Sequence, residues 1–288
     1  MLVWLLRLLA RLPLRWLHAA GAVLGWITYG LSPAYAARMR DNLYASGVCA
    51  GPTECKPLLR EVIAETGKAV TELAAVWFGR DELISRLVRC DTWHVVEGAL
   101  RAGRGILFLT PHLGCFEIAA LYAAQRLPIT VLYRPPKLAF VEPAMIAGRG
   151  RFNATVAPAN LRGVRLLYKA LTRGQAVGLL PDQAPGVGEG VWADFFGRPA
   201  YTMTLVARLR RSTGAAVIMA SAERLPRGAG YCVRFEEVTA GRLDEPALNR
   251  VIEDVVRRCP AQYLWSYNRY KVPAGAEPPP RKSVIRES

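Results

Sequence analysis

The sequence predicts an α/β fold with a mixed or mostly parallel sheet flanked by helices, and three observations predict it. Short, uninterrupted apolar runs recur along the chain, and each is followed by a segment with apolar residues at helical spacing. Strands that are apolar on both faces are typical of parallel sheets covered by helices on both sides. The length of 288 residues suits one large domain of this kind. We therefore expect an N-terminal segment at 1–31, a main domain at 32–271 and a flexible tail at 272–288, which is rich in proline and charge.

Residues 1–31 predict an N-terminal membrane-anchoring helix. Arginines spaced four residues apart form one basic stripe on a helix, beside Trp and Leu side chains that suit a membrane interface; these are Arg7, Arg11 and Arg15. The uncharged stretch 16–31 would be about 24 Å long as a helix, a little shorter than the hydrocarbon core of about 30 Å, so the anchor either spans the bilayer or lies at its interface. Two alternatives stay open: a signal peptide cleaved after Ala34-Tyr35-Ala36, and a packed core helix.

The main domain begins with a helical pattern at 54–78, interrupted by Gly67, and then alternates between strands and helices. Strands are predicted at 105–110, 129–134, 176–181, 215–220 and 231–238. Helices are predicted at 115–127, 138–147, 161–173, 202–213 and 246–258.

The charge and the cysteines restrict the partners and the compartment. Lys and Arg number 38 against 23 Asp and Glu, and the net charge of +15 favours anionic partners. The sequence has no basic tail and no zinc-finger spacing, so we expect no nucleic acid among these partners. The six cysteines form no CxxC or Cys/His pattern, which predicts free thiols in a reducing compartment, no disulfide framework and no metal site.

One histidine lies where α/β proteins place their ligands, at the carboxyl end of a predicted strand. The strand at 105–110 runs into Pro111 and His112, and a predicted helix follows. Glu117 lies in the first turn of that helix, where a carboxylate can fix the tautomer of an imidazole and stabilise its protonated form. We predict that His112 and Glu117 form a catalytic pair. The alternative is that Glu117 interacts with the helix dipole and His112 is a hydrogen-bonding loop residue.

The motif His112-Leu-Gly-Cys-Phe-Glu117 after an apolar strand resembles the late acyltransferases of lipid A biosynthesis. Further segments resemble that family in the same order, and the resemblance extends to about residue 271. They are Tyr133-Arg134-Pro135, Gly148-Arg149-Gly150-Arg151-Phe152-Asn153, Leu161-Arg162-Gly163, Pro181-Asp182-Gln183, Phe195-Phe196-Gly197, and Trp265 through Arg269 with Lys271.

The resemblance implies a glycerolipid-acyltransferase-like fold and direct acyl transfer. A fatty acyl chain would pass from an acyl carrier protein to a hydroxyl of a lipid A precursor, at the cytoplasmic side of the bacterial inner membrane. The thioester of the carrier protein is the co-substrate, and we expect no further cofactor. His112 would act as general base, with Glu117 holding and charging the imidazole. The sequence lacks a G-x-S-x-G nucleophile motif, and we interpret Cys115 as a core residue, so no covalent intermediate is expected.

Four residues are the candidates for substrate binding: Arg134, Arg149, Arg151 and Asp182. Arg149 and Arg151 would supply donors to the oxyanion or to lipid phosphates, with surface charge as the alternative. Arg134 lines the pocket or ends a strand, and Asp182 organises the site or serves as a turn residue. Trp265 is interpreted as a core residue.

Two other functions stay open. The same residue pair would serve a lysophospholipid, aminolipid or other glycolipid O-acyltransferase, and the sequence does not identify the acceptor. A non-catalytic membrane protein that binds anionic lipid would also explain the charge, but such a protein has no use for a paired His and Glu.

Overall fold

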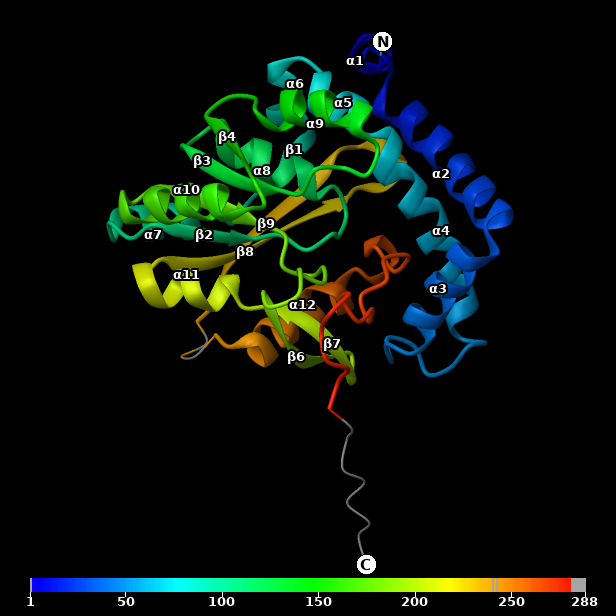
Figure 1. Ribbon diagram of the computed structural model, residues 1–288. Coiled ribbons are helices and arrows are strands. Elements are labelled where there is room, and N and C mark those ends of the chain that lie inside the picture. Colours follow the sequence, from blue (N-terminus) through cyan, green and yellow to red (C-terminus); the bar gives the residue numbers. More distant parts are fainter. Residues whose placement is uncertain (1, 240, 242, 281–288) are drawn as a thin grey trace, which may run out of the picture.

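The computed structural model describes residues 2–239, 241 and 243–280, and it centres on a seven-stranded sheet (Figure 1). In spatial order its strands are β1 (Val88–Arg89), β9 (Tyr231–Glu237), β8 (Ala216–Arg224), β2 (Ile106–Leu109), β5 (Ala176–Leu179), β3 (Ile129–Tyr133) and β4 (Ala154–Pro158). Neighbouring strands are parallel except for β8 and β9, which are antiparallel. The predicted α/β class with a mostly parallel sheet is confirmed.

Helices cover both faces of this sheet, and the alternation along β2 shows how. Ile106 and Phe108 join the core beneath one set of helices, whereas Leu107 and Leu109 join the core beneath the other. The first set is α7 (Trp93–Arg101), α8 (Phe116–Ala124) and α9 (Glu142–Arg149). The second set is α10 (Leu161–Thr172), α11 (Leu205–Thr213) and α12 (Glu245–Arg258). All four residues of β2 are buried, which explains why its sequence is continuously apolar.

The N-terminal part of the chain is helical and packs on the main domain. It comprises α1 (Leu2–Leu9), α2 (Leu14–Leu31), α3 (Pro33–Tyr44), α4 (Cys55–Thr71), α5 (Leu73–Phe78) and α6 (Asp81–Leu87). Within the described part of the chain, none of the helices combines the length and apolar character that crossing a bilayer requires. A helix that spans the membrane is therefore not supported, since Pro13 divides the predicted segment into two helices.

Glycines allow α2 and α4 to approach each other closely. A Cβ atom at Gly67 would lie 1.9 Å from the carbonyl oxygen of Gly21, and one at Gly25 would lie 2.1 Å from that of Ile63. Only hydrogen fits at these positions, and the inner face of α2 is buried as a result. The second helix of the predicted segment 1–31 thus packs directly on α4.

The hairpin of β6 (Gly190–Phe195) and β7 (Arg198–Met203) was not predicted. Its turn places Phe196 and Gly197 at φ angles of 48° and 71°, the positive values that suit two-residue hairpin turns. The predicted helix at 202–213 begins later, at Leu205, because β7 occupies its first residues.

The prediction of free thiols is wrong for one pair of cysteines. Cys49 and Cys55 form a disulfide, with their Cα atoms 5.6 Å apart, in the connection between α3 and α4. A spacing of six residues matches none of the short cysteine motifs, so the sequence pattern did not indicate this bond.

The predicted tail is described only in part. Residues 272–280 contain no helix or strand, and residues 281–288 lie outside the described residues. Among the short 3-10 helices of the described residues, η1 (Ala139–Val141) precedes α9 and η3 (Pro260–Gln262) follows α12.

Candidate active site

The candidate site lies at the carboxyl ends of β2 and β5, which are parallel neighbours. Leu109 pairs with Leu179 in the register of the two strands, and Thr110 N donates to Leu179 O at 2.9 Å. His112 and Asp182 follow their strands at the same distance along the chain, so the sheet brings them face to face.

Asp182 holds His112 through both carboxylate oxygens. Oδ1 lies 2.8 Å from Nδ1 of the imidazole, and Oδ2 accepts from the backbone N–H of His112 at 2.9 Å. Burial alone would raise the pKa of Asp182, but the charge and hydrogen bonds of His112 lower that pKa below its usual value. An ionised carboxylate only accepts hydrogen bonds, so Nδ1 of a neutral imidazole carries the proton and Nε2 presents the lone pair.

Gln183 completes the environment of the imidazole. Its amide nitrogen lies 3.1 Å from Nε2 of His112 and can donate to that lone pair. The ring of His112 also packs against Phe116, with 4.8 Å between the ring centroids. The histidine is therefore fixed in one orientation, with Nε2 as its basic atom.

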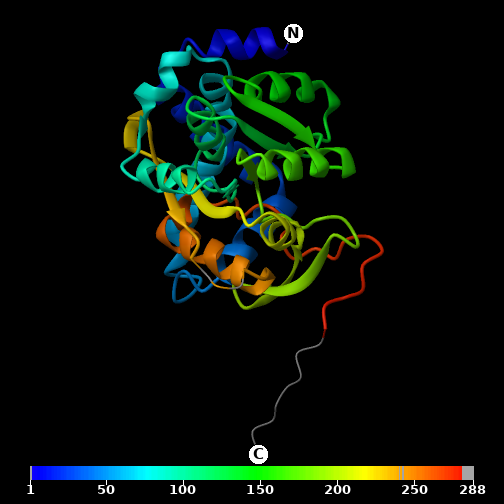
Figure 2. The same ribbon diagram turned by 90° about the vertical axis from the view of Figure 1, so that its left-hand side faces the viewer.

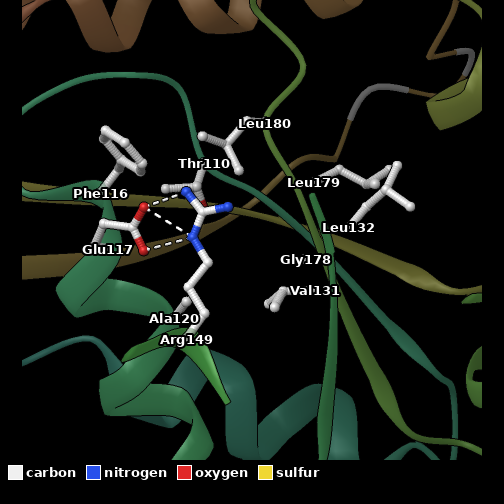
Figure 3. Close-up of a pocket in the computed structure, with 10 residues that line it drawn as sticks. All are labelled: Thr110, Phe116, Glu117, Ala120, Val131, Leu132, Arg149, Gly178, Leu179 and Leu180. Carbon is white, nitrogen blue, oxygen red and sulfur yellow. Dashed lines mark hydrogen bonds and ion pairs between the residues drawn. The ribbon is translucent and has the colours of Figure 1, made fainter. Parts of the chain in front are cut away.

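Glu117 faces Arg149 rather than the imidazole (Figure 3). Nε of Arg149 lies 3.0 Å from each carboxylate oxygen, Nη2 also donates to Oε1, and Trp77 donates to Oε2 at 3.2 Å. The prediction that Glu117 orients His112 is therefore replaced by a different arrangement: Asp182 orients the imidazole, and Glu117 orients Arg149. The reason is geometric, because Glu117 lies on the first turn of α8, which packs beside α9, the helix that carries Arg149.

An apolar pocket opens beside this ion pair, between the strand ends and helices α8 and α9 (Figure 3). Phe116 connects it to His112, and the Nη1 nitrogen of Arg149 is directed into it. The lining residues are Thr110, Phe116, Glu117, Ala120, Val131, Leu132, Arg149, Gly178, Leu179 and Leu180. An apolar pocket with one cation and one histidine at its edge suits an apolar ligand with a polar reacting group.

The other predicted residues have different surroundings. Arg134 is exposed directly after β3, at the same edge of the sheet as His112. Arg151 is not brought to the site, because its guanidinium donates to Val76 O, Gly79 O and Asp81 at 2.7–2.8 Å and so holds the connection between α5 and α6. Cys115 is buried, and burial raises the pKa of its thiol well above the usual value, which supports its interpretation as a core residue.

The C-terminal motif, Trp265 through Arg269 with Lys271, follows a residue that bonds to the backbone of His112. Leu264 N donates to His112 O at 3.0 Å, and Trp265 is buried, which confirms it as a core residue. Arg269 is buried and donates to Tyr201 O and Thr202 Oγ1. Leu264 thus holds the backbone of His112, Arg269 holds β7, and none of these residues lines the pocket.

Two side chains of the site, Gln183 and Trp77, were not predicted as site residues. Gln183 belongs to the motif Pro181-Asp182-Gln183, but its direction toward the imidazole follows only from the position of Asp182 opposite His112. Trp77 matched the apolar spacing of a helix, and its indole N–H gave no signal of its own.

Comparisons with known proteins show which proteins the chain resembles in sequence. The family model for bacterial lipid A biosynthesis acyltransferases matches residues 1–272. The chain is 28% identical over 225 residues to the lipid A biosynthesis palmitoleoyltransferase of Escherichia coli strain K12, which covers 76% of this chain and 72% of that protein. It is 25% identical over 281 residues to the lipid A biosynthesis lauroyltransferase of the same organism, covering 94% and 91%.

Proposed function

Because the chain belongs to the bacterial lipid A biosynthesis acyltransferase family, we propose that it transfers a fatty acyl chain from an acyl carrier protein to a hydroxyl of a lipid A precursor, with His112 as general base. The chain is an acyltransferase. We propose in addition that acyl carrier protein is the donor, that His112 is the base, and that the enzyme acts at the inner membrane. The observation that carries it is the contact of buried Asp182 with Nδ1 of His112, which leaves Nε2 as the proton acceptor at the edge of an apolar pocket.

In the proposed reaction, Nε2 of His112 accepts the proton of the acceptor hydroxyl as its oxygen attacks the thioester carbonyl. The hydroxyl takes the position of the Gln183 amide, which occupies Nε2 in this structure. Asp182 stabilises the imidazolium that forms. The tetrahedral intermediate then expels the thiolate, which receives the proton from Nε2, and the ester remains on the lipid.

Arg149 is the group best placed to meet negative charge. Glu117 holds its guanidinium at two nitrogens, and Nη1 faces the pocket. A cation fixed in this way can stabilise the oxyanion or a phosphate of the lipid without reorganising. Glu117 therefore acts through Arg149, and the apolar walls receive the acyl chain next to the thioester.

We propose that the enzyme binds the membrane at the interface, through the outer face of α1 and α2. Trp16 and Leu31 on this face are 60% and 80% exposed, although both are large and apolar. Arg7 in α1, Arg15 in α2 and Arg11 between the two helices are exposed, and their charge suits anionic lipid. Figure 2 shows α1 lying across one end of the molecule, beside α9. This location at the inner membrane, with the catalytic domain on the cytoplasmic side, would give access to the carrier protein and the lipid.

The test of the base is acyl transfer from labelled acyl carrier protein to a lipid A precursor. His112→Ala should lower the rate by about 10³-fold and leave the melting temperature within about 3 °C. His94→Ala is the matched control, because His94 is exposed on α7, where its Nδ1 lies 3.1 Å from the backbone oxygen of Asp91. Near wild-type transfer by the His112 variant would contradict the mechanism.

The test of the donor is the dependence on salt. An acidic carrier protein should be steered by the positive surface, so activity at subsaturating donor should fall as the Debye length decreases below about 10 Å. Acyl-CoA should show a weaker dependence. Equal dependence for both donors would argue against carrier-protein steering.

The test of the acceptor is mass spectrometry of lipids from a deletion strain. Lipid A should lose the mass of one acyl chain, and bulk phospholipids should stay unchanged. Unaltered lipid A with altered phospholipid or aminolipid would keep the chemistry but assign another acceptor.

The test of the membrane surface is sedimentation with vesicles that contain anionic phospholipid. Trp16→Glu and Ile27→Glu should weaken binding, because both side chains are exposed on α2. Binding of the wild type should persist in high salt, since apolar burial is not screened. Unchanged binding by the variants would exclude this face.

A further inference from the structure

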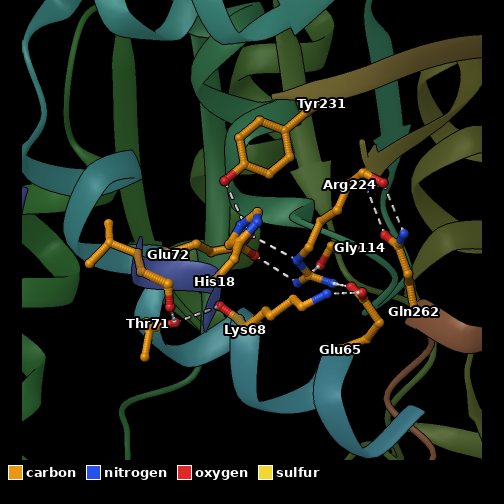
Figure 4. A network of polar contacts seen from close by, with 10 residues as sticks. His18, Glu65, Lys68, Thr71, Glu72, Gly114, Arg224, Tyr231 and Gln262 are labelled. Atoms are coloured by element: carbon orange, nitrogen blue, oxygen red, sulfur yellow. Dashed lines mark hydrogen bonds and ion pairs between the residues drawn. The ribbon is translucent and has the colours of Figure 1, made fainter. Parts of the chain in front are cut away.

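A buried cation, Arg224, contacts the segment that carries the catalytic histidine (Figure 4). Arg224 ends β8, and its guanidinium pairs with Glu72 through Nε at 2.9 Å and Nη2 at 2.7 Å. Nη2 also donates to the carbonyl oxygen of Gly114 at 2.7 Å. Gly114 lies between His112 and Glu117 in the sequence, so this contact reaches the middle of the catalytic segment.

Glu72 is itself held on several sides. Tyr231 donates to Oε2 at 3.0 Å, and Nε2 of His18 lies 3.2 Å from the same oxygen. Burial alone would raise the pKa of Glu72, but Arg224 and His18 lower it to about 2. The carboxylate is therefore charged at neutral pH, and it fixes the plane and direction of the guanidinium.

The peptide of Gly114 is fixed on its other sides as well. Gly114 N donates to Gln262 O at 3.0 Å, and the Gln262 amide pairs with the backbone of Arg224 at 2.7 and 3.1 Å. Gly114 has a φ of 58°, and a Cβ atom there would lie 1.9 Å from Ala222 O. The left-handed conformation and the close approach to β8 both require glycine. The carbonyl that Arg224 contacts is thus part of a tight turn with a single geometry.

We propose that Arg224, oriented by Glu72, is a positioning residue for acyl transfer: its bond to Gly114 O sets the placement of His112 and of the start of α8. This proposal rests on the proposed function. A purely stabilising role would not require these groups, because a buried ion pair is seldom more stabilising than apolar residues of similar size. A planar guanidinium can hold a carboxylate with two nitrogens and still donate to a carbonyl, whereas an ammonium or an apolar side chain cannot.

Two variants separate positioning from stability. Glu72→Leu/Arg224→Met removes both charges together, so no unpaired charge is left in the core. Arg224→Lys keeps a cation opposite Glu72 but loses the fork that also reaches Gly114 O. Arg234→Met is the matched control, because Arg234 lies on the adjacent strand β9 and forms an exposed ion pair with Glu223 at 2.9 Å.

Each variant is measured for kcat and KM with acyl carrier protein donor, and for hydrogen exchange of the peptide that covers residues 110–118. A misplacement of about 1 Å can lower a rate by about 10²-fold, so we expect kcat to fall by about that factor in both variants. KM should change by less than about threefold, because the binding groups remain. The peptide 110–118 should exchange faster, while peptides of the central strands β2 and β5 keep their protection.

Several outcomes would overturn the proposal. Wild-type kcat in the folded double variant would show that Arg224 only stabilises, and so would a loss of activity that matches the unfolded fraction. Unchanged exchange at 110–118 in both variants would do the same without reference to activity. Hydrogen exchange also distinguishes failure of the Arg224 proposal from failure of the proposed function. If the wild-type enzyme transferred no acyl chain, the proposed function would be contradicted, and the exchange of residues 110–118 would still test whether Arg224 positions this segment.

Discussion

Two carboxylate–guanidinium pairs flank the segment from His112 to Glu117, and they differ in how deeply they are buried and in what the guanidinium contacts. In the pair of Glu117 and Arg149 the side chains are 6% and 18% exposed, and one nitrogen of the guanidinium faces a pocket. In the pair of Glu72 and Arg224 both are 2% exposed, and the guanidinium nitrogens contact protein oxygens. The same chemistry thus presents a charge to a ligand on one side and fixes the backbone on the other. The two guanidinium groups differ in how many N–H donors remain for a ligand: Arg149 keeps a nitrogen that faces the pocket, whereas the nitrogens of Arg224 contact protein oxygens.

The largest expected effect tests the enclosed pair. Arg224→Met alone leaves the charge of Glu72 buried without its cation, which should lower the free energy of unfolding by about 3–5 kcal/mol. Denaturant titration in a mild detergent measures this. Glu72→Leu/Arg224→Met should recover most of the loss, and equal stability of the single and double variants would remove the distinction between the pairs.

The next effect concerns acid, because the carboxyl pKa of Glu72 in the enclosed pair is strongly lowered. The pKa of Glu72 falls from 4.5 in the unfolded chain to about 2 in the fold. Because the pKa of Glu72 is lower in the folded protein than in the unfolded chain, its ionisation stabilises the fold. The stabilisation is complete at pH values above the pKa of the unfolded chain, and it is lost as the pH falls through the pKa of the folded protein. This contribution is on the order of 3 kcal/mol.

Glu72→Gln isolates that contribution. The stability difference between wild type and variant should be largest above about pH 5 and should shrink as pH falls toward 2. Acid titration of both proteins by circular dichroism is the measurement. Parallel acid profiles would show that Glu72 is not the linked group.

A smaller effect is expected at the carboxylate that belongs to neither pair. Asp182→Asn replaces one of the two oxygens that bind His112 by an NH2 donor, so the tautomer of His112 is no longer fixed and kcat should fall by about 10²-fold. The pKa of Asp182 lies below its usual value, so the wild type should not lose activity through this group at mildly acid pH. Steady-state kinetics across pH would test this, and activity similar to wild type in Asp182→Asn would return the orienting role to Glu117.

The smallest effect tests the pair at the pocket. Arg149→Lys keeps the charge but loses the two-nitrogen contact with Glu117, and kcat/KM should fall by about tenfold, or 1.4 kcal/mol. Stability should change by less than about 1 kcal/mol, because the pair is partly open to solvent. A variant with full activity would show that the guanidinium geometry has no role in the reaction.

The sequence predicted the elements of the sheet well where burial dictates residue type. Strands buried on both faces, such as β2 and β5, are continuously apolar, and helices with one exposed face, such as α10, have clear amphipathic spacing. The hairpin of β6 and β7 was missed because its strands mix buried and exposed positions without a clear alternation. The very short β1 left no pattern at all.

The position of His112 in the site could be predicted, but its partner could not. Asp182 reaches the imidazole because β2 and β5 are neighbours in the sheet, although the two residues are 70 positions apart and two strands, β3 and β4, lie between β2 and β5 in the sequence. Strand order is a tertiary property, and the sequence favoured Glu117 because it lies nearby along the chain. The same limit explains Arg224, whose contact with Gly114 joins residues 110 positions apart.

The close packing of α2 on α4 has a consequence for anyone who wants a water-soluble form of this enzyme. One face of α2 offers Trp26 and Ile27 to the surroundings, while Gly21 and Gly25 on the other face lie against the backbone of α4. The proposed membrane contact and the folding of the chain would therefore depend on the same helix. Trimming the chain to begin after α2 would bare a groove shaped for a helix and favour aggregation over solubility. Solubility should instead be sought by polar substitutions on the outer face, with the glycines left in place.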